Sequence, residues 1–260
     1  MSVALDFFYQ PYDGLHGESV YSRFLKPLGL WLAYPLNFLG NHNAFALNSS
    51  FFQILTIPFF YIFAFKITKS NFLSTLSVLA FIFSPIVIDH TLRSLVDTGN
   101  WFLYLFTLFF AYLELQKKTP DVKKLFLISF VCGLSSLMKE MGGSAIIYMN
   151  LMLLFNKRFS FSLSYRLKQI TLQSFIFLSP LFLNSLLVYS VYEYTYYDWF
   201  TYNNNTYSNE GIIHFVASIK NSFGIFFLFF LFYYINNKIY NNLEFNFILL
   251  SSVFVFLISV

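Results

Sequence analysis

Charged residues are scarce in this sequence: 11% of its 260 residues are Asp, Glu, Lys or Arg, whereas 57% are hydrophobic. An ordinary soluble domain carries roughly 25% charged residues. A soluble protein of this length could not hide so much apolar surface, because water does not tolerate large contiguous apolar faces. The composition therefore excludes an ordinary soluble protein and indicates one whose surface faces lipid.

Several chemical signatures are also missing. The chain has one cysteine, Cys132, so it cannot form an internal disulfide, and a thiol within an apolar run behaves as a small apolar side chain. No basic tract is interleaved with aromatic residues, which argues against nucleic acid as a partner. The sequence contains no Gly-rich phosphate loop, no Cys/His zinc spacing and no nucleophile elbow.

Long uncharged stretches alternate with short charged ones. A helix needs about 20 residues to cross a hydrocarbon core of about 30 Å. We therefore predict an all-α fold, a polytopic transmembrane bundle of about eight spans. The expected spans are residues 45–65, 70–88, 98–116, 124–138, 141–156, 169–191, 219–237 and 245–260.

The segment before the first span is uncharged over residues 27–43, but Pro27, Pro35 and Gly40 interrupt it. This pattern favours a helix that lies along the membrane surface. We therefore expect an external N-terminal loop with an interfacial helix at 1–43 and a transmembrane helical domain at 44–260.

The basic residues support two short spans rather than one helix over residues 124–156, which would be roughly 50 Å long. With two spans, 11 of the 16 Lys and Arg residues fall on one side, and the positive-inside rule makes that side cytoplasmic. They are Lys66, Lys69, Lys117, Lys118, Lys123, Lys124, Lys157, Arg158, Arg166, Lys168 and Lys238.

The opposite side receives 9 of the 12 acids and all four histidines. This concentration of titratable groups predicts that an active site lies on the non-cytoplasmic side. These residues are Asp6, Asp13, Glu18, Asp89, Asp97, Glu140, Glu193, Asp198, Glu210, His16, His42, His90 and His214.

Two groups of charged residues on that side are candidates for chemistry. Asp6, Asp13 and Glu18 precede the basic pair of Arg23 and Lys26, and such an acid can act as general base toward an acceptor from water. An ordinary solvated loop is the alternative.

The second group lies between two predicted spans and contains Asp89, His90, Arg93 and Asp97. The Arg93 guanidinium suits a lipid phosphate, and the other three side chains suit a divalent cation. Charges that are merely wetted at the interface are the alternative.

Two further candidate sites are a turn rich in small residues, around Lys139, and a loop rich in tyrosine, at 192–214. Lys139 and Glu140 lie among small residues at a predicted hairpin tip, which we expect on the outer face. There Lys139 suits an anionic headgroup, and a plain turn with an exposed ion pair is the alternative. The loop 192–214 is rich in tyrosine, which predicts an interfacial aromatic belt or, alternatively, an acceptor-binding surface.

The order of these features resembles the GT-C superfamily of polyprenyl-phosphate-sugar-dependent glycosyltransferases, such as protein O-mannosyltransferases and lipid A aminoarabinose transferases. The family pattern is an acid-bearing first external loop, a Tyr and Arg-x-x-x-Pro return, and a small-residue helix ending in Lys. The acids of the external loop are Asp6 and Asp13, the return is Tyr21 with residues 23–27, and the small-residue helix is 133–139, which ends in Lys139. Between the return and this helix, the chain also has Phe-Ser-Pro at 83–85 and Asp97 just before a predicted span. Against that pattern, the first helix and the C-terminal part are expected to be missing, and no adjacent Asp-Glu pair marks the catalytic carboxylate.

The resemblance implies an inverting glycosyltransferase that moves a sugar from a polyprenyl-phosphate donor to an acceptor on the non-cytoplasmic face. Its catalytic acid would be Asp13, Asp6 or Glu18. The resemblance further implies that cations near the outer leaflet hold the lipid phosphate, namely Arg93, Lys139 and Arg23. A divalent metal, Mg²⁺ or Mn²⁺, assists some relatives, and Asp97 with His90 would hold it. The membrane would be the plasma membrane in a prokaryote.

Two other readings remain open. A transporter or flippase-like protein would use Asp89, Arg93 and Lys139 to line a polar pathway. An inactive fragment or an assembly subunit is the third possibility.

Overall fold

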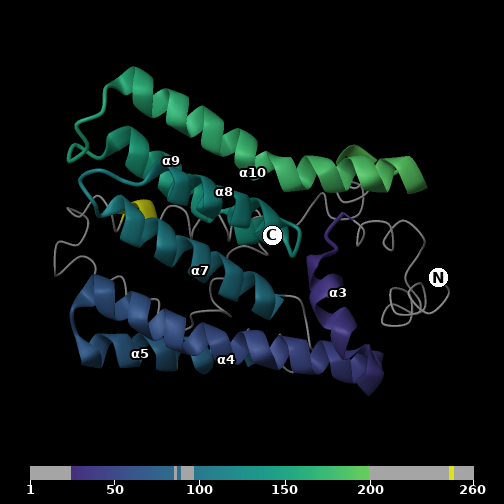
Figure 1. The fold of residues 1–260 in the computed structure, drawn as a ribbon. Helices are drawn as coiled ribbons and strands as arrows, with labels where there is room; N and C mark the ends of the chain where they lie inside the picture. Colours follow the sequence, from purple (N-terminus) through teal and green to yellow (C-terminus); the bar gives the residue numbers. More distant parts are fainter. Residues whose placement is uncertain (1–24, 85–86, 89–96, 199–245, 249–260) are drawn as a thin grey trace, which may run out of the picture.

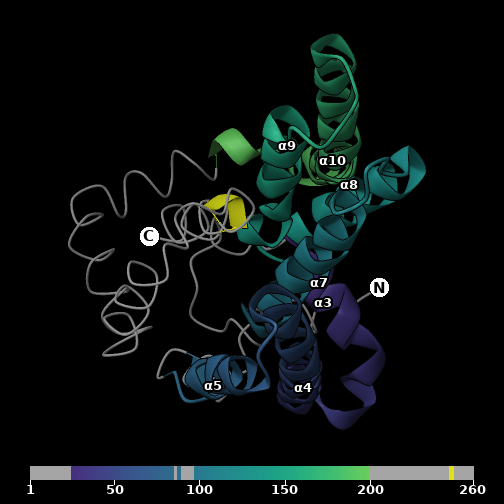
Figure 2. The same cartoon turned by 90° about the vertical axis from the view of Figure 1, so that its left-hand side faces the viewer.

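The computed structural model describes residues 25–84, 87–88, 97–198 and 246–248, and within these ranges the regular elements are helices, without a strand. Most of the helices lie side by side in one bundle, and α3 crosses one end of it (Figures 1 and 2). In chain order they are α3 (Leu28–Ala33), the 3-10 helix η2 (Tyr34–Leu39), α4 (Asn41–Thr68), α5 (Asn71–Ile82), α7 (Asp97–Leu115), α8 (Val122–Ser136), the 3-10 helix η3 (Glu140–Gly143), α9 (Ala145–Phe155) and α10 (Leu163–Tyr192). The prediction of an all-α fold is confirmed for this part of the chain.

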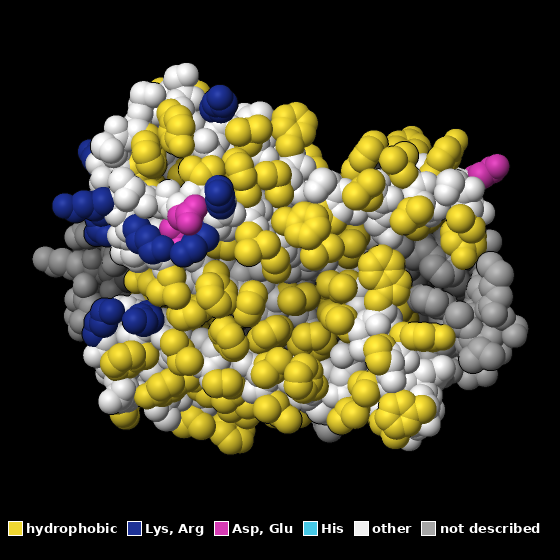
Figure 3. Space-filling model, viewed as in Figure 1, with side chains coloured by type: hydrophobic (Ala, Val, Ile, Leu, Met, Phe, Trp, Pro, Cys, Tyr) yellow, Lys and Arg dark blue, Asp and Glu magenta, His cyan; other side chains and the backbone are white. Residues whose placement is uncertain are grey.

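Two helices are long and apolar enough to cross a membrane, over Asn43–Thr68 in α4 and Leu163–Tyr192 in α10. The 30 residues of α10 give it a length of about 45 Å. Its outward side chains are apolar and accessible, as with Phe175 at 68% and Phe182 at 62% exposure, and apolar side chains cover much of the face in Figure 3. These features support association with a membrane. The predicted span at 219–237 and most of that at 245–260 lie outside the described residues.

The bundle has a basic end. The turns from α4 to α5, from α7 to α8 and from α9 to α10 lie at the same end in Figure 1, and the Lys and Arg side chains gather there in Figure 3. These turns and the helix ends beside them carry ten of the eleven predicted cytoplasmic cations, all except Lys238, which is outside the described residues. The fold therefore places these ten basic residues at one end of the bundle.

Helices α8 and α9 are separate, and η3 lies between them. This arrangement confirms the choice of two helices over one at 124–156. Glycine allows α8 to approach α10 closely: a Cβ atom at Gly133 would lie 2.1 Å from the backbone oxygen of Phe177. Pro180, on the same turn of α10, has no N–H for its helix bond, and the hydroxyl of Ser179 donates to the Ile176 carbonyl at 2.7 Å instead.

The core lies between α4, α7, α8 and α9, and Tyr148, Met149 and Met152 of α9 are fully buried in it. Phe59 of α4 contacts Phe102 and Phe109 of α7 edge to face, at ring-centroid distances of 5.6 and 6.1 Å. Such ring pairs add stability beyond the burial of their area. Cys132 is also buried in this core, as expected of a structural thiol.

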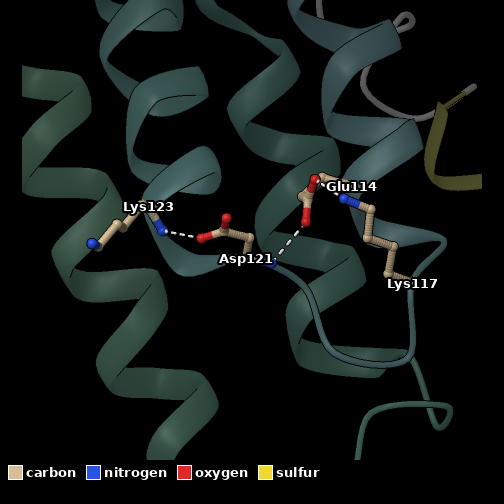
Figure 4. A network of polar contacts seen from close by, with 4 residues as sticks. All are labelled: Glu114, Lys117, Asp121 and Lys123. Atoms are coloured by element: carbon tan, nitrogen blue, oxygen red, sulfur yellow. Dashed lines mark hydrogen bonds and ion pairs between the residues drawn. The ribbon is translucent and has the colours of Figure 1, made fainter.

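One buried acid lies at the basic end. Glu114, at 5% exposure, accepts hydrogen bonds from the Lys117 ammonium at 2.5 Å and from the Asp121 backbone N–H at 2.7 Å (Figure 4). Asp121 in turn accepts from the Lys123 backbone N–H at 2.9 Å and caps α8. The buried Glu114 and the exposed Asp121 therefore both hold the α7–α8 turn in place.

Candidate functional site at the hairpin tip

The hairpin tip, residues 135–144, connects α8 to α9 at the end of the bundle opposite the basic turns. It is more deeply buried than its sequence predicts: Ser135, Ser136, Leu137 and Met138 are each exposed by 4% or less. Lys139 is half-buried. Other elements therefore cover the residues just before Lys139, whereas the side chain of Glu140, the other member of the ion pair weighed as an alternative, is not among those described.

Glycines make the tight turn possible. A Cβ atom at Gly142 would lie 2.5 Å from the Ser135 carbonyl oxygen, and one at Gly143 would lie 2.1 Å from the Ser136 hydroxyl oxygen. Any larger residue would collide with the last turn of α8, so η3 can fold back on that turn only with glycine at these positions.

The chain before α4 covers the tip. The Leu28 backbone N–H donates to the Leu137 carbonyl at 3.0 Å, so the start of α3 is joined to the tip. Just before it, the Leu25 carbonyl accepts from the Asn184 amide at 3.1 Å and from the Tyr196 hydroxyl at 2.9 Å. The predicted interfacial segment is helical over α3 and η2 and closes over the hairpin tip.

Buried polar side chains of α4 and α7 lie near the hairpin tip. The hydroxyls of Ser49 and Thr98 are buried and 2.9 Å apart. Asn100 is 3% exposed, and its Oδ1 lies 2.9 Å from the place that a Cβ of Gly142 would take. No hydrogen-bond partner reaches this oxygen among the described residues, so a buried acceptor lies against the tip. Sequence reasoning missed Asn100, although an amide inside an apolar span is a recognisable signal.

The structure brings together the segments that carry two predicted site residues. Asp97 is the first residue of α7. A Cβ atom at Gly99, two residues later, would lie 2.6 Å from the methyl carbon of Met138, the neighbour of Lys139. The other predicted site residues lie outside the described ranges, and they are Asp6, Asp13, Glu18, Arg23, His90 and Arg93.

The chain beyond α10 carries described acids at this end of the bundle. Asp198 accepts hydrogen bonds from the Thr195 hydroxyl at 2.6 Å and from the Thr195 backbone N–H at 2.7 Å. These bonds favour the carboxylate and hold the pKa of Asp198 below its usual value. At the start of the predicted aromatic loop, Tyr194 is buried against Leu25, whereas Tyr197 is exposed. Tyr194 therefore helps to fix the cover of the tip.

A metal site finds no support in the described part of the chain, which contains no group of three or more His, Cys, Asp or Glu residues able to hold an ion. Of the two predicted ligands, His90 is not described and Asp97 begins α7. We therefore derive no step through a metal.

Comparisons with protein families, with curated proteins and with solved structures found no match for this chain. The function proposed below accordingly depends on the residues and the geometry described above.

Proposed function

We propose that this chain is a multi-pass integral membrane protein of about eight spans whose basic end faces the cytoplasm. Two helices of sufficient length and apolar character support this proposal, together with the gathering of lysines at one end of the bundle. The hairpin tip and the start of α7 then belong to the non-cytoplasmic half.

At that tip we place a glycosyltransferase site that takes a sugar from a polyprenyl-phosphate donor. The observation that carries this proposal is the half-buried Lys139 on a tip packed against the buried Asn100 oxygen, which has no hydrogen-bond partner among the described residues. An ammonium group shielded from bulk water stabilises phosphate charge more strongly than an exposed one. The amide oxygen of Asn100 accepts a hydrogen bond and therefore suits a sugar hydroxyl.

The reaction is a single displacement. An external carboxylate, Asp13, Asp6 or Glu18, removes the proton of the acceptor hydroxyl, whose oxygen attacks the anomeric carbon. The bond between that carbon and the phosphate oxygen breaks, and its electron pair leaves with the polyprenyl phosphate. Lys139, with Arg23 and Arg93, stabilises the leaving charge, and the configuration at the sugar is inverted.

The test is transfer of labelled sugar from a polyprenyl-phosphate donor by the full chain in lipid vesicles. Lys139→Gln should lower kcat by at least about tenfold, because it removes a charge that interacts with the leaving phosphate. Lys139→Arg should keep a substantial part of the activity. The matched control is Lys157→Gln, which removes an exposed lysine at the basic end and should not change the rate.

The catalytic acid is tested in the same assay. Asp13→Asn and Asp6→Asn are compared with the wild type. The variant that lacks the catalytic base should show no sugar transfer, whereas its thermal stability should equal that of the wild type. Normal transfer in both variants and in Glu18→Gln would refute the assignment. Uptake of donor or sugar into the vesicles without any glycosyl product would instead favour the transporter alternative.

A further inference from the structure

The basic end of the bundle presents a group of exposed cations, here called the basic rim. Its members come from the turns α4–α5, α7–α8 and α9–α10 and from the helix ends beside them, which lie at the same end of the molecule (Figure 1). They are Lys66, Lys69, Lys117, Lys118, Lys123, Lys124, Lys157, Arg158 and Lys168, all exposed.

Among the described residues, two acids lie at this end, Glu114 and Asp121, and they offset only a small part of the charge of the nine rim cations. Glu114 is buried and binds Lys117 and the Asp121 backbone, while Asp121 caps the start of α8. Lys117 forms a salt bridge with Glu114. The described residues therefore give the rim a net positive charge.

The rim is also held in a fixed shape. Arg166 donates hydrogen bonds to backbone carbonyls at the end of α9 and in the following turn, including those of Asn156 at 2.9 Å and Phe159 at 2.6 Å. Arg158 Nη1 donates to Gln116 Oε1 at 3.3 Å and so joins the α9–α10 turn to the α7–α8 turn. The two turns that carry these cations are consequently linked to each other.

Exposed apolar side chains lie next to the rim cations in the sequence. Phe155 is 51% exposed two residues before Lys157, and Leu167 is 48% exposed directly before Lys168. Phe65, directly before Lys66, is 37% exposed. The boundary between lipid headgroups and acyl chains matches both the cations and the apolar side chains beside them.

We propose that the basic rim binds the headgroups of anionic phospholipids, with the phosphates on the lysines and the acyl chains against the adjoining apolar side chains. This inference rests on the membrane-embedded part of the proposed function and not on sugar transfer. It makes the rim a site for anionic lipids such as phosphatidylglycerol, in preference to zwitterionic ones.

The test uses the full purified chain in detergent, with phosphatidylglycerol and phosphatidylcholine of equal chain length as probes, and native mass spectrometry to count the bound lipid. The wild type should prefer phosphatidylglycerol, and the preference should weaken at high salt. The triple variant Lys118→Gln, Lys124→Gln and Lys157→Gln should lose about fivefold in relative affinity for each neutralised lysine. The matched triple Lys→Arg variant keeps the charges and should keep the preference.

Equal affinity of the wild type for the two lipids, or an unchanged preference in the glutamine variant, would overturn the proposal. Displacement of phosphatidylglycerol by equimolar polyphosphate or RNA would also overturn it, because the rim would then select phosphate without the acyl chain. Failure of the sugar-transfer assay while the lipid preference persists would remove only the enzymatic proposal. Sugar transfer by a protein that shows no lipid preference would refute only the proposal of lipid binding at the basic rim.

Discussion

The side-chain amide of Asn184 donates a hydrogen bond of 3.1 Å to the backbone carbonyl of Leu25, 159 positions earlier in the chain. Asn184 is buried in α10, and Leu25 is fully buried ahead of α3. A buried carbonyl or amide without a partner is costly, so each group satisfies the other. This bond holds the segment that covers the hairpin tip.

Replacing Asn184 should therefore loosen that cover. Asn184→Ala leaves the Leu25 carbonyl with the Tyr196 hydroxyl as its described partner and should lower the free energy of unfolding in detergent by about 1 to 3 kcal/mol. The matched control is Ser190→Ala, on the same helix, whose exposed hydroxyl bonds only to its own backbone turn at Leu187. An equal effect of the two changes would contradict the role of Asn184.

The contact of α8 with α10 depends on the missing side chain of Gly133. Gly133→Ala should destabilise the chain by about 1 to 3 kcal/mol, because the new Cβ would meet the backbone oxygen of Phe177, which cannot move without displacing α10. Thermal unfolding in detergent measures the effect. Leu127→Ala, at a 64% exposed position of the same helix, is the control and should change stability much less. A neutral Gly133→Ala variant would show that the helices can separate at no cost.

The planar guanidinium of Arg166 holds the turn between α9 and α10 through several hydrogen bonds at once. Its Nε donates to the Phe161 carbonyl at 3.0 Å, and its two Nη atoms donate to the Asn156 and Phe159 carbonyls. A lysine cannot reproduce this geometry, so Arg166→Lys should cost about 2 to 3 kcal/mol of stability. Hydrogen exchange at the end of α9 should rise in that variant. Lys168→Gln, a change at an exposed position on the same helix, should leave this exchange unchanged, and protection equal to wild type in Arg166→Lys would refute the role.

The turn after α10 should respond to acid. The pKa of Asp198 is lowered in the folded protein by its bonds from Thr195, so the carboxylate form stabilises the turn. This stabilisation is complete above the ordinary aspartate pKa of about 3.9 and is lost as the pH falls through the lower, folded pKa. The amide resonance of Thr195 should follow that titration in NMR spectra. Asp198→Asn should abolish the response, and a pH-independent resonance in the wild type would contradict the expectation.

Much of the fold follows from local sequence patterns. The uncharged stretch at 45–65 predicts α4, and the lysines at 157 and beyond require a turn that separates α9 from α10. Both inferences depend on the cost of placing charge in an apolar environment, which acts residue by residue. The candidate site is less predictable. The small residues around Lys139 point to it in the sequence, whereas nothing local shows that Asn100 lies against the tip, since Gly142 is 42 positions away in the chain.

For the described residues, the sequence by itself determined that the fold is helical and apolar, that the helices alternate in direction, and that basic residues gather at one end of the bundle. Only the tertiary structure decided that the hairpin tip is buried, that Leu25 covers it through Asn184, and that Glu114 lies inside the basic end. The physical reason is that charge and hydropathy act locally along the chain. Close packing at glycines and the pairing of buried polar groups depend instead on which distant segments meet.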